Sequence, residues 1–235
     1  MAILKKRVHI VPVAFEFDRA VLPVTEIGAD KVYLLTGAQE GEGPKSSLMG
    51  ARVHKALKDK VKEIEIVNYG FYDYDAIFKE LVKIARKEKG SEVLINLSSG
   101  GRIVSIAGIL AASMYAWTPY YAKPKEYGGK ERSKGLKEIF EIATYPVEAP
   151  TEKLVACLGE IEGIETQKSL ILKLQRKGII QAEDKDKASK KSYMEFRRDF
   201  LNSLCDKGWM TKEDCGRSSR LEITDAGKEI LKIFG

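Results

Sequence analysis

The sequence predicts an α/β fold, in which a Rossmann-like parallel sheet with helices on both faces is followed by a smaller second domain rich in helices. Three observations predict it. Short apolar runs alternate with helical patterns through the first part of the chain, and this alternation stops near Pro146 and Pro150. Helical patterns dominate afterwards. A chain of 235 residues is long enough for two domains, which we place at residues 1–147 and 148–235.

Four short runs rich in Val, Ile, Leu and Tyr predict the strands of the first domain. They are RVHIVPVAF at 7–15, KVYLLTG at 31–37, EIEIVNYG at 63–70 and EVLINLSSG at 92–100. Helices are predicted between them, at 18–30, 44–60 and 73–90. In the last of these, apolar residues recur at helical spacing from Ile77 to Ala85, and Gly90 closes the helix. Parallel strands need such crossovers, so both faces of the sheet are covered.

The stretch INLSSGGRIVSIAG, residues 95–108, contains the turn after the fourth strand. In parallel sheets ligands bind outside the carboxyl ends of the strands, where the first and fourth strands are neighbours in common windings. Glycines let a backbone approach a ligand closely, serines offer hydroxyls, and an arginine at the next helix start offers a planar donor to phosphate. The ligand candidates are Asn96, Ser98, Ser99, Gly100, Gly101 and Arg102. The alternative is a plain strand-to-helix turn whose glycines serve geometry alone.

A second polar segment, PVAFEFDRA, follows the first strand. It lacks the glycine fingerprint of dinucleotide-binding turns, and the chain has no P-loop pattern, so NAD and ATP are not the expected ligands. We expect its aromatic rings and its polar side chains to lie near the same carboxyl end of the sheet, and this combination suits a nucleotide. The candidates are Ala14, Phe15, Glu16, Asp18 and Arg19. The alternative is that Phe15 and Phe17 are core residues and Asp18 is a helix cap.

These features together resemble the CARF domain, the CRISPR-associated Rossmann fold: a first strand ends in a polar turn and a fourth strand ends in INLSSGGR. The resemblance implies a homodimer that binds cyclic oligoadenylate across its two-fold axis. By position, residues 98–102 are then the main contacts, with residues 14–19 beside them.

The second domain resembles a winged helix-turn-helix of the kind found in archaeal transcription regulators, because a helix ending in LCDKGWM precedes a hairpin and LEITDAGKEIL. In that helix the apolar residues from Tyr193 to Leu204 lie on one side, and polar residues remain for the major groove. Wing arginines are placed to reach phosphates. The candidates for double-stranded DNA are Lys191, Arg197, Arg198, Asn202, Arg217 and Arg220. The alternative is that these are solvated charges, since residues 148–235 carry 17 basic and 16 acidic residues.

We therefore expect a ligand-responsive, DNA-binding transcription regulator that senses a cyclic oligonucleotide as a homodimer. Two alternatives remain. One is a metal-independent ring nuclease, in which a ribose 2′-hydroxyl attacks and Arg102 or Ser99 orients the phosphate. The other is a protein-interaction module without a ligand. The basic insertion PKEYGGKERSKG, residues 124–135, is a lid, a DNA contact or a solvated loop, and the solvated loop is favoured.

Composition and motifs argue against several other classes. No apolar run reaches the roughly 18 residues needed to cross a bilayer, and the first residues do not resemble a signal peptide, so we expect a cytoplasmic protein without a membrane partner. Cys157, Cys205 and Cys215 form no CxxC pair, so neither zinc nor a disulfide framework is expected, and no cofactor is predicted. His9 and His54 adjoin no nucleophilic serine motif and are interpreted as structural. Heavy use of Lys and Glu is typical of hot-living organisms.

Overall fold

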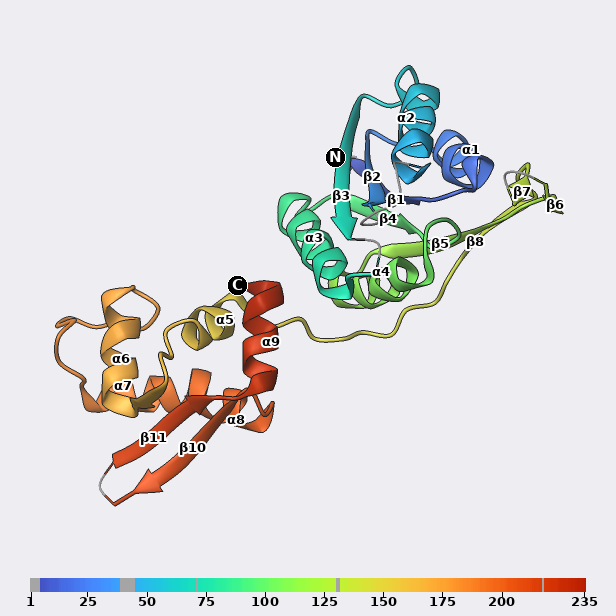
Figure 1. Ribbon diagram of the computed structural model, residues 1–235. Helices are drawn as coiled ribbons and strands as arrows, with labels where there is room; N and C mark the ends of the chain where they lie inside the picture. Colours follow the sequence, from blue (N-terminus) through green and yellow to red (C-terminus); the bar gives the residue numbers. More distant parts are fainter. Residues whose placement is uncertain (1–4, 39–44, 71, 130–131, 217) are drawn as a thin grey trace. The chain divides into compact units, whose positions relative to one another are not determined.

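The computed structural model describes residues 5–38, 45–70, 72–129, 132–216 and 218–235. The chain divides into two compact units, Met1–Ala149 and Pro150–Gly235 (Figure 1).

The first unit is built on a sheet whose strand order is β3-β2-β1-β4-β5-β8 among the described residues. Its strands are β1 (Arg7–Val13), β2 (Lys31–Ala38), β3 (Glu63–Gly70), β4 (Glu92–Asn96), β5 (Thr118–Lys123) and β8 (Glu138–Glu141). The strands from β3 to β5 run parallel, and β8 returns antiparallel to β5. The predicted adjacency of the first and fourth strands is confirmed, since Ile10 lies opposite Ile95.

Helices cover both faces of this sheet, as predicted. They are α1 (Phe17–Ile27), α2 (Lys45–Leu57), α3 (Tyr74–Lys87) and α4 (Arg102–Tyr115). Figure 1 shows α1 and α2 on one face and α3 and α4 on the other. The apolar stripe of α3 is buried from Ile77 to Ile84, and valines of β1 pack with those of α1 in the opposite layer. The parallel arrangement therefore follows from helices that each bury one apolar face.

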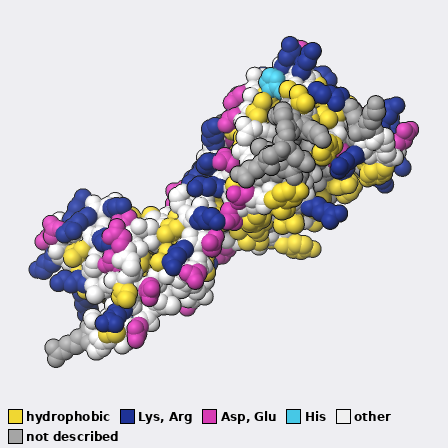
Figure 2. Space-filling view, in the orientation of Figure 1, with side chains coloured by type: hydrophobic (Ala, Val, Ile, Leu, Met, Phe, Trp, Pro, Cys, Tyr) yellow, Lys and Arg dark blue, Asp and Glu magenta, His cyan; other side chains and the backbone are white. Residues whose placement is uncertain are grey.

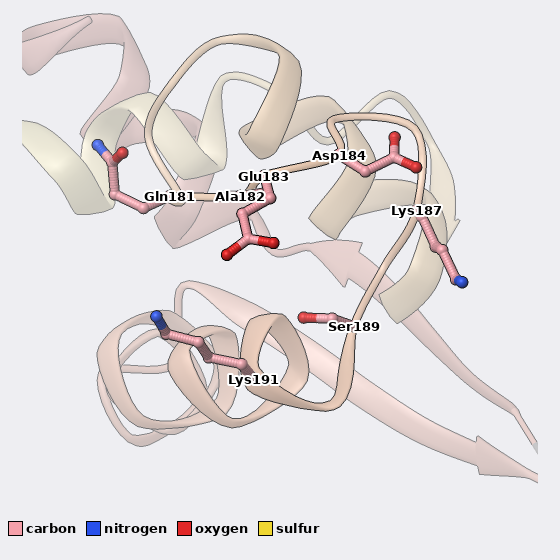
Figure 3. Close-up of a pocket in the computed structure, with 7 residues that line it drawn as sticks. All are labelled: Gln181, Ala182, Glu183, Asp184, Lys187, Ser189 and Lys191. Carbon is pink, nitrogen blue, oxygen red and sulfur yellow. The ribbon is translucent and has the colours of Figure 1, made fainter.

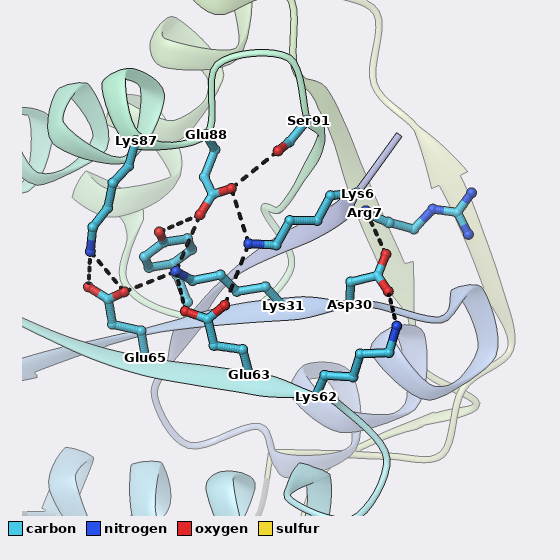
Figure 4. Close-up of polar contacts among 11 residues, drawn as sticks. Lys6, Arg7, Asp30, Lys31, Lys62, Glu63, Glu65, Lys87, Glu88 and Ser91 are labelled. Atoms are coloured by element: carbon cyan, nitrogen blue, oxygen red, sulfur yellow. Dashed lines mark hydrogen bonds and ion pairs between the residues drawn. The ribbon is translucent and has the colours of Figure 1, made fainter. Parts of the chain in front are cut away.

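An ion-pair network closes the amino end of the sheet (Figure 4). The buried ammonium of Lys31 lies 2.7 Å from a carboxylate oxygen of Glu63 and 3.3 Å from one of Glu88, while the Tyr33 hydroxyl donates to Glu88 at 2.7 Å. Burial by itself raises the pKa of Glu88, but the hydrogen bonds from Tyr33 and Lys31 outweigh it and lower that pKa. These charges serve stability, because the carboxyl end, where ligands bind in such sheets, is the opposite end.

The basic insertion contains a short β-hairpin where we favoured a solvated loop. Strand β6 (Glu126–Tyr127) pairs antiparallel with β7 (Ser133–Lys134). The hairpin lies between β5 and β8 in the sequence, so it projects from the end of the sheet at which β5 finishes (Figure 1).

The second unit has the order of elements of a winged helix. Its elements are α5 (Glu152–Leu158), β9 (Ile164–Thr166), α6 (Gln167–Arg176), α7 (Lys190–Phe196), a π-helical turn η1 (Arg197–Leu201), α8 (Asn202–Asp206), β10 (Met210–Cys215), β11 (Ser218–Ile223) and α9 (Asp225–Phe234). The strands pair in the order β10-β11-β9. Thr224 caps α9, because its hydroxyl accepts from the Gly227 amide at 3.1 Å. Across the described parts of the chain, no helix is both long and apolar enough to pass through a bilayer.

Candidate functional site

The turns after β1 and β4 meet at the carboxyl edge of the sheet, because the two strands are neighbours. Gly100 has φ +90°, and a Cβ atom there would lie 2.6 Å from Cβ of Pro12 and 2.9 Å from Cγ1 of Val104. No real Cβ atom approaches a neighbour so closely. The plain geometric role considered for this glycine therefore holds, and the turn is pressed against the end of β1.

The buried polar residues of the β4 turn join the two turns. The amide of the Asn96 side chain donates to the Arg19 carbonyl at 2.8 Å, and its oxygen accepts from the Ser98 amide at 2.9 Å. The Ser99 hydroxyl donates to the Pro12 carbonyl at 2.6 Å, and both serine side chains are buried. The side chains of Asn96 and Ser99 thus face the protein interior, and a ligand would meet the backbone of this turn rather than their polar groups.

The exposed part of this turn is positively charged. Gly101 is the N-cap of α4 and provides no side-chain hydrogen bond to the helix, and the first turn of α4 contains no acidic residue. Arg102 is exposed and has no hydrogen bond or ion pair with any residue that the structure describes. The amides and positive dipole end of α4 therefore combine with a guanidinium, and this arrangement suits an anion.

The β1 turn is mostly occupied by contacts within the protein. Arg19 is 4% exposed, and it forms a 2.7 Å ion pair with Glu16 and donates from Nε to the Ala122 carbonyl at 2.9 Å. Asp18 accepts from the Gly135 amide at 2.7 Å. Asp18 is not the helix cap that we considered, because the N-cap of α1 is Glu16.

Phe15 is the member of this turn with the largest exposed apolar surface, at 39%, whereas Ala14 is nearly buried. Phe17 packs partly buried against the core between α1 and β1, so the structural interpretation holds for this ring. The guanidinium of Arg132 lies 4.4 Å from the centre of the Phe15 ring. The sequence interpretation missed Arg132, since nothing in the linear order places residues 124–135 against the β1 turn.

His9 lies within β1 and is fully buried, with Nδ1 3.2 Å from the Tyr120 hydroxyl. Burial, aided by the positive charge of Arg7, lowers its pKa to about 4, so the ring is neutral at pH 7. This supports the structural interpretation of His9. Among the described residues no group of three or more His, Cys, Asp or Glu side chains is arranged to hold a metal ion.

In the second unit the four helical candidates for DNA contact, Lys191, Arg197, Arg198 and Asn202, are all exposed. Arg198 forms a double hydrogen bond with Asp199 at 2.5 and 2.7 Å, which offsets its charge in the free protein. Arg220 is exposed and lies opposite Glu213 in the β10–β11 pair, and Arg217 lies outside the described residues. Met194, 65% exposed, is a residue of this helix that the sequence interpretation assigned no role.

A cavity of about 620 Å³ lies beside this helix (Figure 3). Its lining includes Glu183 and Asp184 from the α6–α7 connection together with Lys187 and Lys191. The buried Gln175 holds this connection through bonds from Nε2 to the Asp184 and Lys187 carbonyls, each 3.4 Å long. Because the lining carries both signs of charge, the cavity does not favour a ligand of either sign.

The fold and the two sites define a class of protein, a Rossmann-like domain joined to a winged helix. Residues 7–127 match the family described as "HFX_2341_N:-like, N-terminal", and the chain belongs to that family. Residues 153–235 match the DUF6293 C-terminal winged helix domain. The predicted architecture, a Rossmann-like parallel sheet covered by helices and followed by a winged helix domain, is confirmed.

The chain is also similar to individual proteins. It is 30% identical over 186 residues to the protein MJ1513 of Methanocaldococcus jannaschii. The matched residues make up 64% of this chain and 54% of the relative, so the chain spans about half the relative's length. Can2 from Sulfobacillus thermosulfidooxidans, solved with cyclic tetra-adenylate, shares 11% identity with a TM-score of 0.46 over 96% of this chain and 61% of Can2. Csm6 from Enterococcus italicus, bound to cyclic hexa-2′-fluoro-hexa-dAMP, shares 13% identity with a TM-score of 0.43 over 86% and 55% of the two chains.

Proposed function

We propose that this protein is a ligand-responsive, DNA-binding transcription regulator. The first domain of a homodimer binds a nucleotide of the cyclic oligoadenylate type at the carboxyl edge of the sheet, and the winged helix binds double-stranded DNA. One observation carries the proposal: Arg102 stands exposed at an α4 start that has no side-chain cap and no acidic residue in its first turn. The class of ligand comes from the resemblance of the INLSSGGR turn to CARF domains.

The outer surface of α4 supports a homodimer. From Ile103 to Tyr115 this helix carries no charged residue, and Ile106 is 59% exposed. Figure 2 shows hydrophobic side chains gathered on the first unit over α4 and β8. Helices with an apolar outer face bury it against a partner. Because Arg102 begins the same helix, a second copy packed on α4 brings a second Arg102 towards the first, and the two turns together suit a ligand with several phosphates.

The exposed face of the helix formed by α7, η1 and α8 supports DNA binding. Lys191, Met194, Arg198 and Asn202 follow one another at spacings of three or four residues. A face of this kind offers cations to phosphates, and Arg and Asn side chains pair with base edges in the major groove. In a homodimer the two winged helices meet two half-sites, so the DNA sequence bound by the protein should be palindromic.

Calorimetry with cyclic and linear oligoadenylates tests the ligand site. Arg102→Ala removes a charge-assisted contact, and we expect binding to weaken by roughly 10- to 100-fold, since hydrogen bonds to charged groups contribute about 1.5 to 3 kcal/mol. Lys58→Ala, just beyond α2, should leave the affinity unchanged. If the wild type binds no oligoadenylate, the ligand proposal is wrong and the interaction module without a ligand gains support.

Chromatography of the ring after incubation separates the sensor from the ring nuclease. An intact ring supports the sensor. Of the two residues considered for orienting phosphate, Ser99 already donates its hydroxyl to Pro12, so cleavage would depend on Arg102. Cleaved ring with the wild type, and intact ring with Arg102→Ala, would establish the enzyme instead.

A further inference from the structure

The basic insertion lies at the same edge of the sheet as the candidate ligand site. Strand β5 runs parallel to β4, so both strands end at the carboxyl edge. The described residues 124–129 and 132–135, which we call the arm, begin directly after β5, and β7 of the arm contacts α1. The topology therefore places the arm beside the turns after β1 and β4.

Polar contacts fix the arm to the start of α1. Asp18 accepts from the Gly135 amide at 2.7 Å. Arg19, one residue further, donates to the Ala122 carbonyl in β5, and its guanidinium lies 4.7 Å from the centre of the Tyr121 ring. The strand that leads into the arm and the residue that ends it are thus both bonded to α1, which gives the arm a defined position.

Arg132 lies at the tip of the arm in an unusual conformation. Its φ is +58°, a left-handed backbone that residues other than glycine seldom adopt, although Gly128 and Gly129 stand nearby. Its guanidinium lies 4.4 Å from the centre of the Phe15 ring, while Arg132 itself is exposed. One face of the guanidinium is therefore covered by the ring, and the other is open to solvent.

Two buried polar atoms in the same region have no partner among the described residues. They are Nη2 of Arg19, which is 4% exposed, and Oγ of Ser133, which is 1% exposed. Buried polar groups are nearly always paired, and unpaired ones point to a water, an ion or a ligand. Both atoms belong to the elements that hold the arm, so the arm region offers hydrogen-bonding capacity that the protein itself does not use.

We propose that the arm forms one wall of the ligand site and that Arg132, stacked on Phe15, binds a nucleobase of the ligand against its open face. Nucleobases stack on guanidinium planes as well as on aromatic rings, and the contact tolerates any base. The α4 start then holds phosphate while Arg132 holds a base. Asp18, which we expected to contact the ligand, is a positioning residue that holds the arm. The inference rests on the proposed nucleotide ligand.

The decisive variant is Arg132→Gly. Glycine adopts a φ of +58° without strain, so the variant should unfold at the same temperature as the wild type or a higher one. It should bind cyclic tetra-adenylate about 10-fold more weakly, as expected for the loss of one stacked base. Arg132→Lys keeps the charge without the plane and should lose nearly as much. Lys134→Ala removes an equal charge from the same arm and should bind like the wild type.

A spectroscopic measurement separates stacking from a purely structural role. A cyclic tetra-adenylate with one adenine replaced by 2-aminopurine should lose fluorescence on binding to the wild type and keep more of it in Arg132→Gly and Phe15→Leu. If the wild type binds the ring and Arg102→Ala weakens it, while Arg132→Gly binds and quenches like the wild type, the role of the arm is refuted and the proposed function stands. If the wild type binds no ring, both proposals are overturned together.

Discussion

Replacing Gly100 with alanine should destabilise the first unit far more than the same change at Gly90. Both glycines have a left-handed backbone, with φ of +90° and +87°. Alanine in that region costs about 1 to 2 kcal/mol. At Gly90 no atom lies within 4 Å of the added Cβ, so we expect that cost alone. At Gly100 the Cβ would lie 2.6 Å from Pro12 and 2.9 Å from Val104, and overpacking adds roughly 1 to 3 kcal/mol. The sum is roughly 2 to 5 kcal/mol.

Urea denaturation followed by tryptophan fluorescence measures this difference. Trp117 is buried in the first unit and Trp209 belongs to the second, so a Trp209→Phe background reports the first unit alone. The free energy of unfolding should fall by about 1 to 2 kcal/mol in Gly90→Ala and by roughly 1 to 3 kcal/mol more than that in Gly100→Ala. Equal losses in the two variants would show that the β4 turn does not press against the end of β1. The inferred contact between the turn after β4 and the turn after β1, on which the position of Arg102 depends, would then be wrong.

Three further predictions concern pH, assembly and DNA. Burial holds the pKa of His9 at about 4 instead of 6.5, so between these values the unfolded chain binds a proton that the folded chain excludes. Stability should fall by about 3 kcal/mol as the pH drops from 6.5 to 4, and His9→Gln should flatten that slope in urea titrations; an unchanged slope contradicts the assignment. Ile106→Glu should turn the proposed dimer into a monomer in light scattering, whereas Ile66→Glu on the exposed side of β3 should not. Arg198→Ala should weaken binding to double-stranded promoter DNA and reduce the slope of log affinity against log salt by about 1. Lys228→Ala on α9 is the matched control, and equal effects of the two changes would argue against a specific role for Arg198.

The sequence predicted the fold of the first unit because its signals are local. The stripe from Ile77 to Ile84 predicts α3 by period alone, and four apolar runs separated by helices leave a parallel sheet as the simplest solution. The adjacency of β1 and β4 was also predicted correctly, since the common strand orders of such sheets place those two strands side by side. The second unit followed from the order of its helices and its hairpin. The π-helical turn at Arg197–Leu201 was not predicted, because the apolar residues from Tyr193 to Leu204 recur at spacings that an uninterrupted α-helix also shows.

The direction of individual side chains at the site was beyond the sequence. Ser98 and Ser99 lie in a polar turn, and the sequence pattern is compatible with serine side chains that face either the solvent or the protein interior. The structure turns Ser99 inward because the Pro12 carbonyl at the end of β1 needs a donor and lies 2.6 Å away. Arg102, the first residue of α4, remains exposed. Such choices depend on a partner supplied by a strand some 85 residues earlier, which no local pattern encodes.

The two ends of the sheet differ in how fully their polar groups are used, and this difference bears on function. At the amino end Lys31 is bonded to several carboxylates, and Glu88 accepts from both Lys31 and Tyr33. At the carboxyl edge Arg102 has no partner among the described residues, and the buried Nη2 of Arg19 has none either. An unpaired buried donor costs stability, so Nη2 of Arg19 retains hydrogen-bonding capacity for something that binds at this edge. Arg102 and Arg19 both offer guanidinium groups, whose natural acceptors are phosphate oxygens.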